Sequence, residues 1–286
     1  MPYTLLLTAA LAVSAQAQAQ APSPGVRQYL ALAEATVRQP IRPEELETAL
    51  LSARGVETLR GLFERSLEES LVSNGVLVTP ELGGEATLDA GRLTLVAYPD
   101  PVHPLLREVA GLEDEPARLL ERLSSSPDGQ QILSGTGGLH ALLYQMANGE
   151  PTDAERALLR KVLDGAVATH FKTWSTDPAI QARMIETTEW RGRYVGFWHI
   201  HPPRFHSGEL APGLEPSVPD MTNAVELGQF LTVVFQPEGF DAYDLSALAG
   251  LGAPDLRRAR VTRYRDPEWR AAFEALVRLR LAHAED

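Results

Sequence analysis

The stretch that decides the fold is Gly196-Phe197-Trp198-His199-Ile200-His201-Pro202-Pro203, and Pro216-Ser217-Val218-Pro219-Asp220 follows it. The residues before the first histidine are aromatic and β-branched, which favours a β-strand. Side chains alternate between the two faces of a strand, so His199 and His201 are expected on the same face. Two such imidazoles and one carboxylate would form a zinc site that keeps the open position of a catalytic site.

Asp220 is the predicted third ligand, because it begins a helical stretch, 220–227, that a proline-rich loop joins to the histidine strand. A continuous apolar run over 229–236 follows this helix and predicts a buried strand. A further short strand is expected over 241–245, after the turn Pro237-Glu238-Gly239. The expected order is strand, paired histidines, loop, helix, buried strand, turn and strand.

This order, with His-x-His-Pro, a spacer and Ser-x-x-Asp, resembles the JAMM (MPN-plus) metallopeptidases over roughly residues 183 to 246. His199, His201, Ser217 and Asp220 match the family's pattern one for one. The resemblance implies an α/β fold with a mixed, largely antiparallel sheet flanked by helices, layered as in cytidine deaminases. It also implies one zinc ion per chain, held by His199, His201 and Asp220, and hydrolysis of peptide or isopeptide bonds.

The resemblance further implies two catalytic roles. Ser217 would hydrogen-bond the developing oxyanion, and a glutamate from an earlier strand would move a proton from water to the leaving amine. No clear motif marks that glutamate. If Arg191-Gly192 is a two-residue hairpin turn, 181–190 is a strand and Glu186 pairs with Phe197. Glu186 would then share a face with the histidines, and it is the predicted base.

Two questions remain open: which glutamate is the base, and whether Ser217-x-x-Asp220 is a helix cap. Glu189 replaces Glu186 if the register slips by one residue. Four more distant glutamates lie near the ends of other elements, namely Glu69, Glu81, Glu85 and Glu150. Ser217-x-x-Asp220 is also typical of a helix cap in which the aspartate reaches back, and such a cap is compatible with metal binding.

The spacer between His201 and Ser217 has fifteen residues, about twice the length that is usual in the family. The extra segment, 204–215, contains His206, Glu209 and Glu215. We expect it to form a lid or a further binding element.

Composition limits the classes of partner. The 286 residues carry a net charge of −12 and include no cysteine. No basic stripe is present, so nucleic acid is not expected as a partner. The absence of cysteine excludes disulfides, a thiol nucleophile and a thiolate metal site. The expected partner is a peptide or protein substrate, and the sequence leaves the oligomeric state open.

The N-terminus predicts export. The apolar run Leu5–Val13 is followed by an Ala/Gln tract that offers several A-x-A cleavage sites, as in a secretory signal peptide over 1–21. No Lys or Arg precedes the run, so an uncleaved Ala/Gln tail is the alternative. No other stretch is long and apolar enough to span a bilayer. We therefore expect a periplasmic or secreted protein without membrane insertion.

The rest of the chain is predicted to be largely helical. Helices are expected over 27–38, 44–52, 56–72, 104–123, 139–147, 152–170 and 267–284, with Thr152 and Glu155 as a capping box. Strands are expected over 76–79 and 92–98. A loop over 124–129 suggests two parts: a helical N-terminal region with two short strands, 22–125, and a JAMM-like domain, 126–286. The functional alternatives are a non-catalytic MPN-like scaffold and an exported metal-binding module.

Overall fold

The computed structural model is an α/β protein whose largest sheet is mixed and mostly antiparallel, as the sequence predicts. It describes residues 22–73, 76–98, 102–109, 112, 114–170, 178–203, 205–206, 209–211, 213–227, 229–248 and 255–284. The predicted signal peptide, 1–21, lies outside the described residues. In the described part of the chain, no helix combines the length and the apolar character that a membrane span requires.

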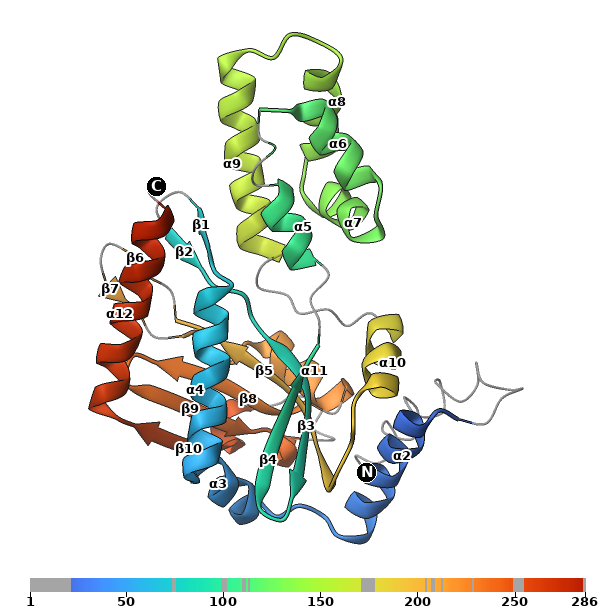
Figure 1. The fold of residues 1–286 in the computed structure, drawn as a ribbon, viewed down its shortest axis with the longest axis vertical. Coiled ribbons are helices and arrows are strands. Elements are labelled where there is room, and N and C mark those ends of the chain that lie inside the picture. The colour runs from blue at the N-terminus through green and yellow to red at the C-terminus, as the bar shows by residue number, and fades with distance from the viewer. Residues whose placement is uncertain are drawn as a thin grey trace.

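Six strands form the main sheet, in the order β10-β9-β8-β5-β3-β4 (Figure 1). Their bounds are β3 Gly83–Asp89, β4 Arg92–Ala97, β5 Arg193–His201, β8 Gln229–Gln236, β9 Gly239–Asp244 and β10 Arg260–Arg265. Every neighbouring pair is antiparallel except β5 and β8. A parallel pair needs a crossover connection, and α11 (Val218–Leu227) lies in the one between these two strands.

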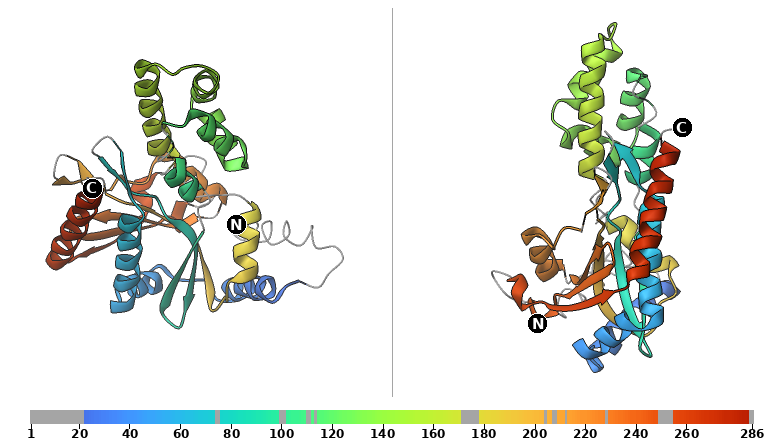
Figure 2. Two further views of the ribbon diagram at one scale, coloured as in Figure 1. Left: turned by 45° about the horizontal axis from the view of Figure 1, so that its top comes forward. Right: turned by 90° about the vertical axis from the view of Figure 1, so that its left-hand side faces the viewer.

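Helices cover both faces of this sheet (Figure 2). The main core lies on the face covered by α4 (Ala53–Glu68) and α12 (Pro267–Ala284), where Trp198 and Ile200 of β5 join Phe63 and Phe273. Because side chains alternate along a strand, Phe197, His199 and His201 point to the opposite face. On that face lie α11, α2 (Pro24–Arg38) and α10 (Pro178–Thr187). The remaining helix, α3 (Pro43–Leu51), contacts α4 and the strands β4 and β10.

A second, small sheet has the order β1-β2-β6-β7. It consists of β1 (Leu71–Ser73), β2 (Val76–Val78), β6 (Phe205–His206) and β7 (Glu209–Leu210). The last two strands belong to the extra segment between His201 and Ser217. This segment is therefore a β-hairpin that pairs with β2 through Leu77 and Phe205.

Five helices form a separate unit beyond one end of the main sheet, as Figure 1 shows. They are α5 (Val102–Val109), α6 (Pro116–Ser124), α7 (Pro127–Gly135), α8 (Leu139–Ala147) and α9 (Asp153–His170), and they share one hydrophobic cluster. The division expected at 125/126 falls between α6 and α7, inside this cluster. Of the loop predicted over 124–129, only Ser125 and Ser126 connect the two helices, because Ser124 ends α6 and Pro127 begins α7. The Ser126 hydroxyl caps α7 by accepting a hydrogen bond from the Gly129 N–H at 3.1 Å.

Most of the predicted helices form. The helices over 139–147 and 267–284 have the predicted bounds, and the Thr152–Glu155 capping box is present, with Thr152 N–H donating to the Glu155 carboxylate at 2.8 Å. The single helix predicted over 104–123 is two helices, α5 and α6. The end of the helix predicted over 56–72 is wrong, because the chain leaves α4 at Glu68 and enters β1.

The strand predicted over 181–190 is wrong, because these residues lie mainly in helix α10. Pro178 occupies its first position, which proline favours, and Ala, Gln, Met and Glu are good helix formers. Met184 and Ile185 are buried in a cluster with Tyr29 of α2. The helices approach closely at Gly25, where a Cβ atom would lie 2.4 Å from the Glu186 carbonyl oxygen.

Candidate metal centre

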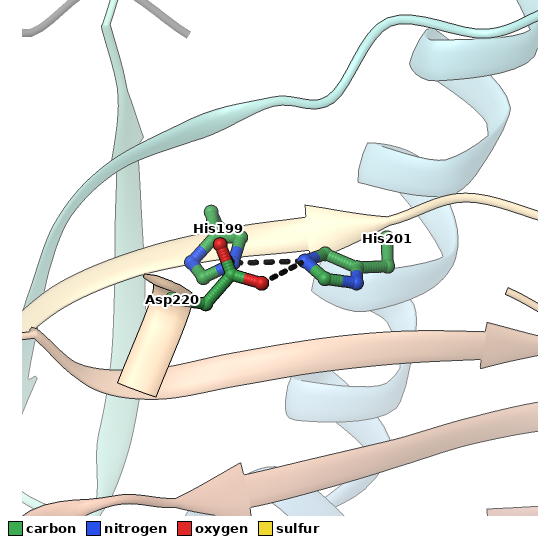
Figure 3. A group of neighbouring side chains, drawn as sticks. All are labelled: His199, His201 and Asp220. Atoms are coloured by element: carbon green, nitrogen blue, oxygen red, sulfur yellow. Dashed lines mark hydrogen bonds and ion pairs between the residues drawn. The ribbon is translucent and has the colours of Figure 1, made fainter. Parts of the chain in front are cut away.

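Three side chains converge at the carboxyl end of β5, as the sequence predicts (Figure 3). His199 and His201 come from β5, and Asp220 lies in the first turn of α11. The two histidine Nε2 atoms are 2.9 Å apart. The Asp220 carboxylate oxygens lie 3.9 Å from Nε2 of His199 and 3.6 Å from Nε2 of His201. These residues could hold a metal ion, since one ligand atom from each lies within 4.8 Å of the others.

The helix cap that the sequence predicts is also present. The Ser217 N–H donates to Oδ2 of Asp220 at 2.6 Å, and the Asp220 N–H donates to the Ser217 hydroxyl oxygen at 3.3 Å. This reciprocal pair fixes the aspartate at the start of α11. Capping therefore aims the carboxylate at the histidines and leaves the Ser217 hydroxyl hydrogen available to donate elsewhere.

Each histidine is oriented through its second ring nitrogen. Nδ1 of His201 lies 2.6 Å from the Leu214 carbonyl oxygen, and Nδ1 of His199 lies 3.4 Å from the Thr232 hydroxyl. A carbonyl oxygen can only accept, so Nδ1 of His201 carries the hydrogen. In the neutral ring, Nε2 then carries a lone pair that points at Asp220 and His199.

Electrostatics keep His199 in the form that binds metal. Burial lowers the pKa of His199 well below its usual value, the neighbouring His201 lowers it further, and Asp220 partly opposes both effects. His199 is therefore neutral at pH 7, and a neutral imidazole is the form that coordinates a metal ion.

The hairpin on which the prediction of Glu186 as the base depends does not form, because Glu186 lies in helix α10. Glu186 is exposed on α10, and the strand position opposite Phe197 belongs to Glu85 of β3. Glu189 is exposed and forms an ion pair with Arg191. The predicted pairing failed because β5 takes its antiparallel partner from β3, far away in the sequence.

Glu85 is buried, with 1% of its surface exposed, and three tyrosine hydroxyls surround its carboxyl group. Tyr29 and Tyr98 donate to one oxygen, and Tyr194 donates to the other. Burial raises the pKa of Glu85 to about 7, although the tyrosine hydrogen bonds act in the opposite direction. Because tyrosines already occupy both oxygens, this carboxyl group is poorly suited to exchange protons with a substrate.

When the β3–β5 register is extended beyond Gly83, Glu81 is the glutamate that falls nearest to the two histidines. Gly83 pairs with His199, and the Ile200 N–H donates to the Leu82 carbonyl at 2.9 Å, so Glu81 falls opposite His201. Directly opposed residues in an antiparallel pair share a face. Glu81 is partly exposed, unlike Glu85. From the sequence, Glu81 is only one of four more distant glutamates, because no strand is predicted over 83–89 that would pair with the histidine strand.

Comparisons with known proteins give no family for this chain. No family model, no curated protein and no solved structure matches it.

Proposed function

We propose that this protein is an exported, zinc-dependent hydrolase of peptide or isopeptide bonds that resembles the JAMM metallopeptidases. The observation that carries the proposal is the convergence of His199, His201 and Asp220 at the carboxyl end of a strand. Two nitrogens bound to one tetrahedral zinc ion lie about 3.3 Å apart. The 2.9 Å between the Nε2 atoms is close to that separation.

The donor set supports zinc as the metal. Two imidazoles and one carboxylate are a common catalytic zinc set, with one position left for water or substrate. When bound, zinc supplies a Lewis acid that makes water more acidic and polarises a carbonyl group. The Leu214 carbonyl and the Thr232 hydroxyl hold the imidazoles in the orientation that such an ion needs.

The chain's own residues supply the remaining chemistry. Glu81, opposite His201, takes a proton from the attacking water and passes it to the leaving amine. The Ser217 hydroxyl oxygen accepts from the Asp220 N–H, which leaves the hydroxyl hydrogen to donate to the developing oxyanion. Glu81 replaces Glu186 as the proposed base because the strand register supports it.

Hydrolysis of a random peptide library by the zinc-loaded protein tests this function. We expect cleavage that stops when a chelator removes the metal and returns when zinc is added. A His201→Ala variant should cleave nothing, whereas His140→Ala, in the helical unit, should match the wild type. Zinc binding without cleavage in the wild type would contradict the hydrolase and favour a metal-binding module. Absence of both zinc and cleavage would favour a scaffold.

Export is proposed from residues 1–21 alone. We expect the signal to be cleaved between Ala17 and Ala21 in the native host. N-terminal sequencing of the native protein decides this, and a cytoplasmic chain that still begins at Met1 would refute export.

A further inference from the structure

Two large apolar side chains lie exposed beside the metal ligands. Leu214 is 58% exposed and Val218 is 65% exposed, and we call this pair the apolar rim. The Leu214 carbonyl accepts the hydrogen bond of His201, and Val218 directly follows Ser217, whose N–H donates to Asp220. Leu214 therefore contacts a candidate ligand directly, and Val218 is the sequence neighbour of a residue that does.

The backbone holds the apolar rim in place. On the N-terminal side of the rim, the Gly213 N–H donates to the Phe235 carbonyl of β8 at 3.0 Å. Gly213 passes so close to β5 that a Cβ atom there would lie 2.3 Å from the His201 carbonyl oxygen. After it, α11 begins with the Ser217–Asp220 cap. Because the segment is fixed at both ends, a ligand would gain contact area without first ordering a loop.

The position of the rim indicates what it contacts. Because the Leu214 carbonyl contacts His201 and Val218 follows the Ser217 that contacts Asp220, a peptide bound at the three candidate ligands would lie near both rim residues. Burying apolar surface there is favourable, and a polar side chain would gain nothing. Glu215, which is exposed between them, would repel an acidic residue. The net charge of −12 adds to that repulsion.

We propose that the apolar rim selects an apolar residue next to the scissile bond of a neutral or basic peptide. This proposal rests on the proposed hydrolase function and names its substrate class. An apolar contact of this size typically discriminates between substrates by roughly 10- to 200-fold.

A random 12-residue peptide library, with cleavage products sequenced by mass spectrometry, tests the preference. For the wild type we expect Leu, Ile, Val, Met or Phe to be favoured over Asn at one side of the cut by at least roughly 10-fold, and Asp to be disfavoured. Leu214→Asn and Val218→Thr should lower that ratio several-fold with zinc content retained. Leu158→Asn, at a 49% exposed leucine of α9, is the matched control and should keep it.

Methyl NMR provides a readout that does not need cleavage. The protein, with methyl-labelled Leu and Val, is titrated with two uncleaved peptides that differ only by Leu or Asn. We expect the Leu peptide to shift the Leu214 and Val218 resonances, and the Asn peptide to shift them much less. Zinc-dependent cleavage without apolar preference would overturn the rim but leave the hydrolase. If the Leu peptide but not the Asn peptide shifts the Leu214 and Val218 resonances, and the peptide library is not cleaved, the result would support the rim and contradict the hydrolase.

Discussion

At the scale of single residues, Glu81 and Glu85 come from the same region of the chain but have different surroundings. Glu81 is partly exposed and falls opposite His201, whereas Glu85 is buried under three tyrosine hydroxyls. Glu85 pairs with Phe197 on the sheet face that carries the histidines, and the same register extended beyond Gly83 is the basis for placing Glu81 there. Their surroundings suit them to different roles: Glu81 is the proposed base, and Glu85 joins α2 to the sheet through Tyr29.

Replacing Glu81 with glutamine tests the assignment of the base. Glu81→Gln keeps the shape of the side chain and removes the proton acceptor, so hydrolysis should fall by on the order of 100-fold or more. Zinc content should not change, because Glu81 is outside the three-residue group. Glu186→Gln, at an exposed position of α10, is the matched control. Loss of hydrolysis in the control, with an active Glu81→Gln enzyme, would reverse the assignment.

The buried Glu85 predicts a pH dependence of stability. Its pKa is about 7 in the folded chain, against an ordinary value of 4.5, so the folded state binds the proton more tightly. The stabilising contribution is complete below pH 4.5 and is lost as the pH rises to about 7. The loss should be about 3 kcal/mol. Tyr29, Tyr98 and Tyr194 are the titratable groups that face it.

Urea unfolding of the metal-free protein measures this effect. The free energy of unfolding of the wild type, minus that of Glu85→Gln, should decrease by about 3 kcal/mol between pH 4.5 and pH 7.5. Glu189→Gln removes an exposed carboxyl group and should follow the wild type at every pH. Parallel pH curves for wild type and Glu85→Gln would show that Glu85 does not titrate in this range.

At the scale of elements, the segment 213–217 leads into α11 and contacts the candidate metal centre through the Leu214 carbonyl. Gly213→Ala would place a Cβ atom 2.3 Å from the His201 carbonyl oxygen and 3.1 Å from that of Phe235. The segment must then shift, which moves the Leu214 carbonyl away from His201. Loss of such a supporting contact typically lowers metal affinity 10- to 100-fold.

Zinc affinity by competition with a chelator measures this prediction. Gly61→Ala is the matched control, because a Cβ atom there would have no neighbour within 4 Å. An unchanged zinc affinity in Gly213→Ala would mean that the segment does not orient His201.

Local patterns predicted many of the elements, and the failures have physical causes. Paired histidines, a capped helix and the apolar run of β8 are local signals, and all three are confirmed. The α10 helix was missed because burial against α2 is a tertiary contact that periodicity does not report. β3 was missed because glycines are unusual inside strands, whereas Gly84 allows close packing here: a Cβ atom there would lie 1.8 Å from the Val96 carbonyl oxygen.

At the scale of the whole molecule, a helical unit with its own hydrophobic cluster separates β4 from β5 in the sequence. The main sheet nevertheless brings β3 beside β5, and this pairing places Glu81 opposite His201. Strand pairing over such a separation gives no local sequence signal, so the three candidate ligands could be predicted from the sequence and the proposed base could not. The candidate metal centre lies on β5, an interior strand of the main sheet, and the insertion leaves the pairing of β5 with β3 and β8 intact.

The zinc content of the purified protein tests the central claim most directly. The account predicts about one zinc ion per chain in the wild type and in His140→Ala, and none in the His199→Ala/His201→Ala double variant. Circular dichroism of the double variant establishes that it is folded. A folded double variant that retains about one zinc ion per chain, or a wild type that binds none when zinc is supplied at pH 7, would contradict the account.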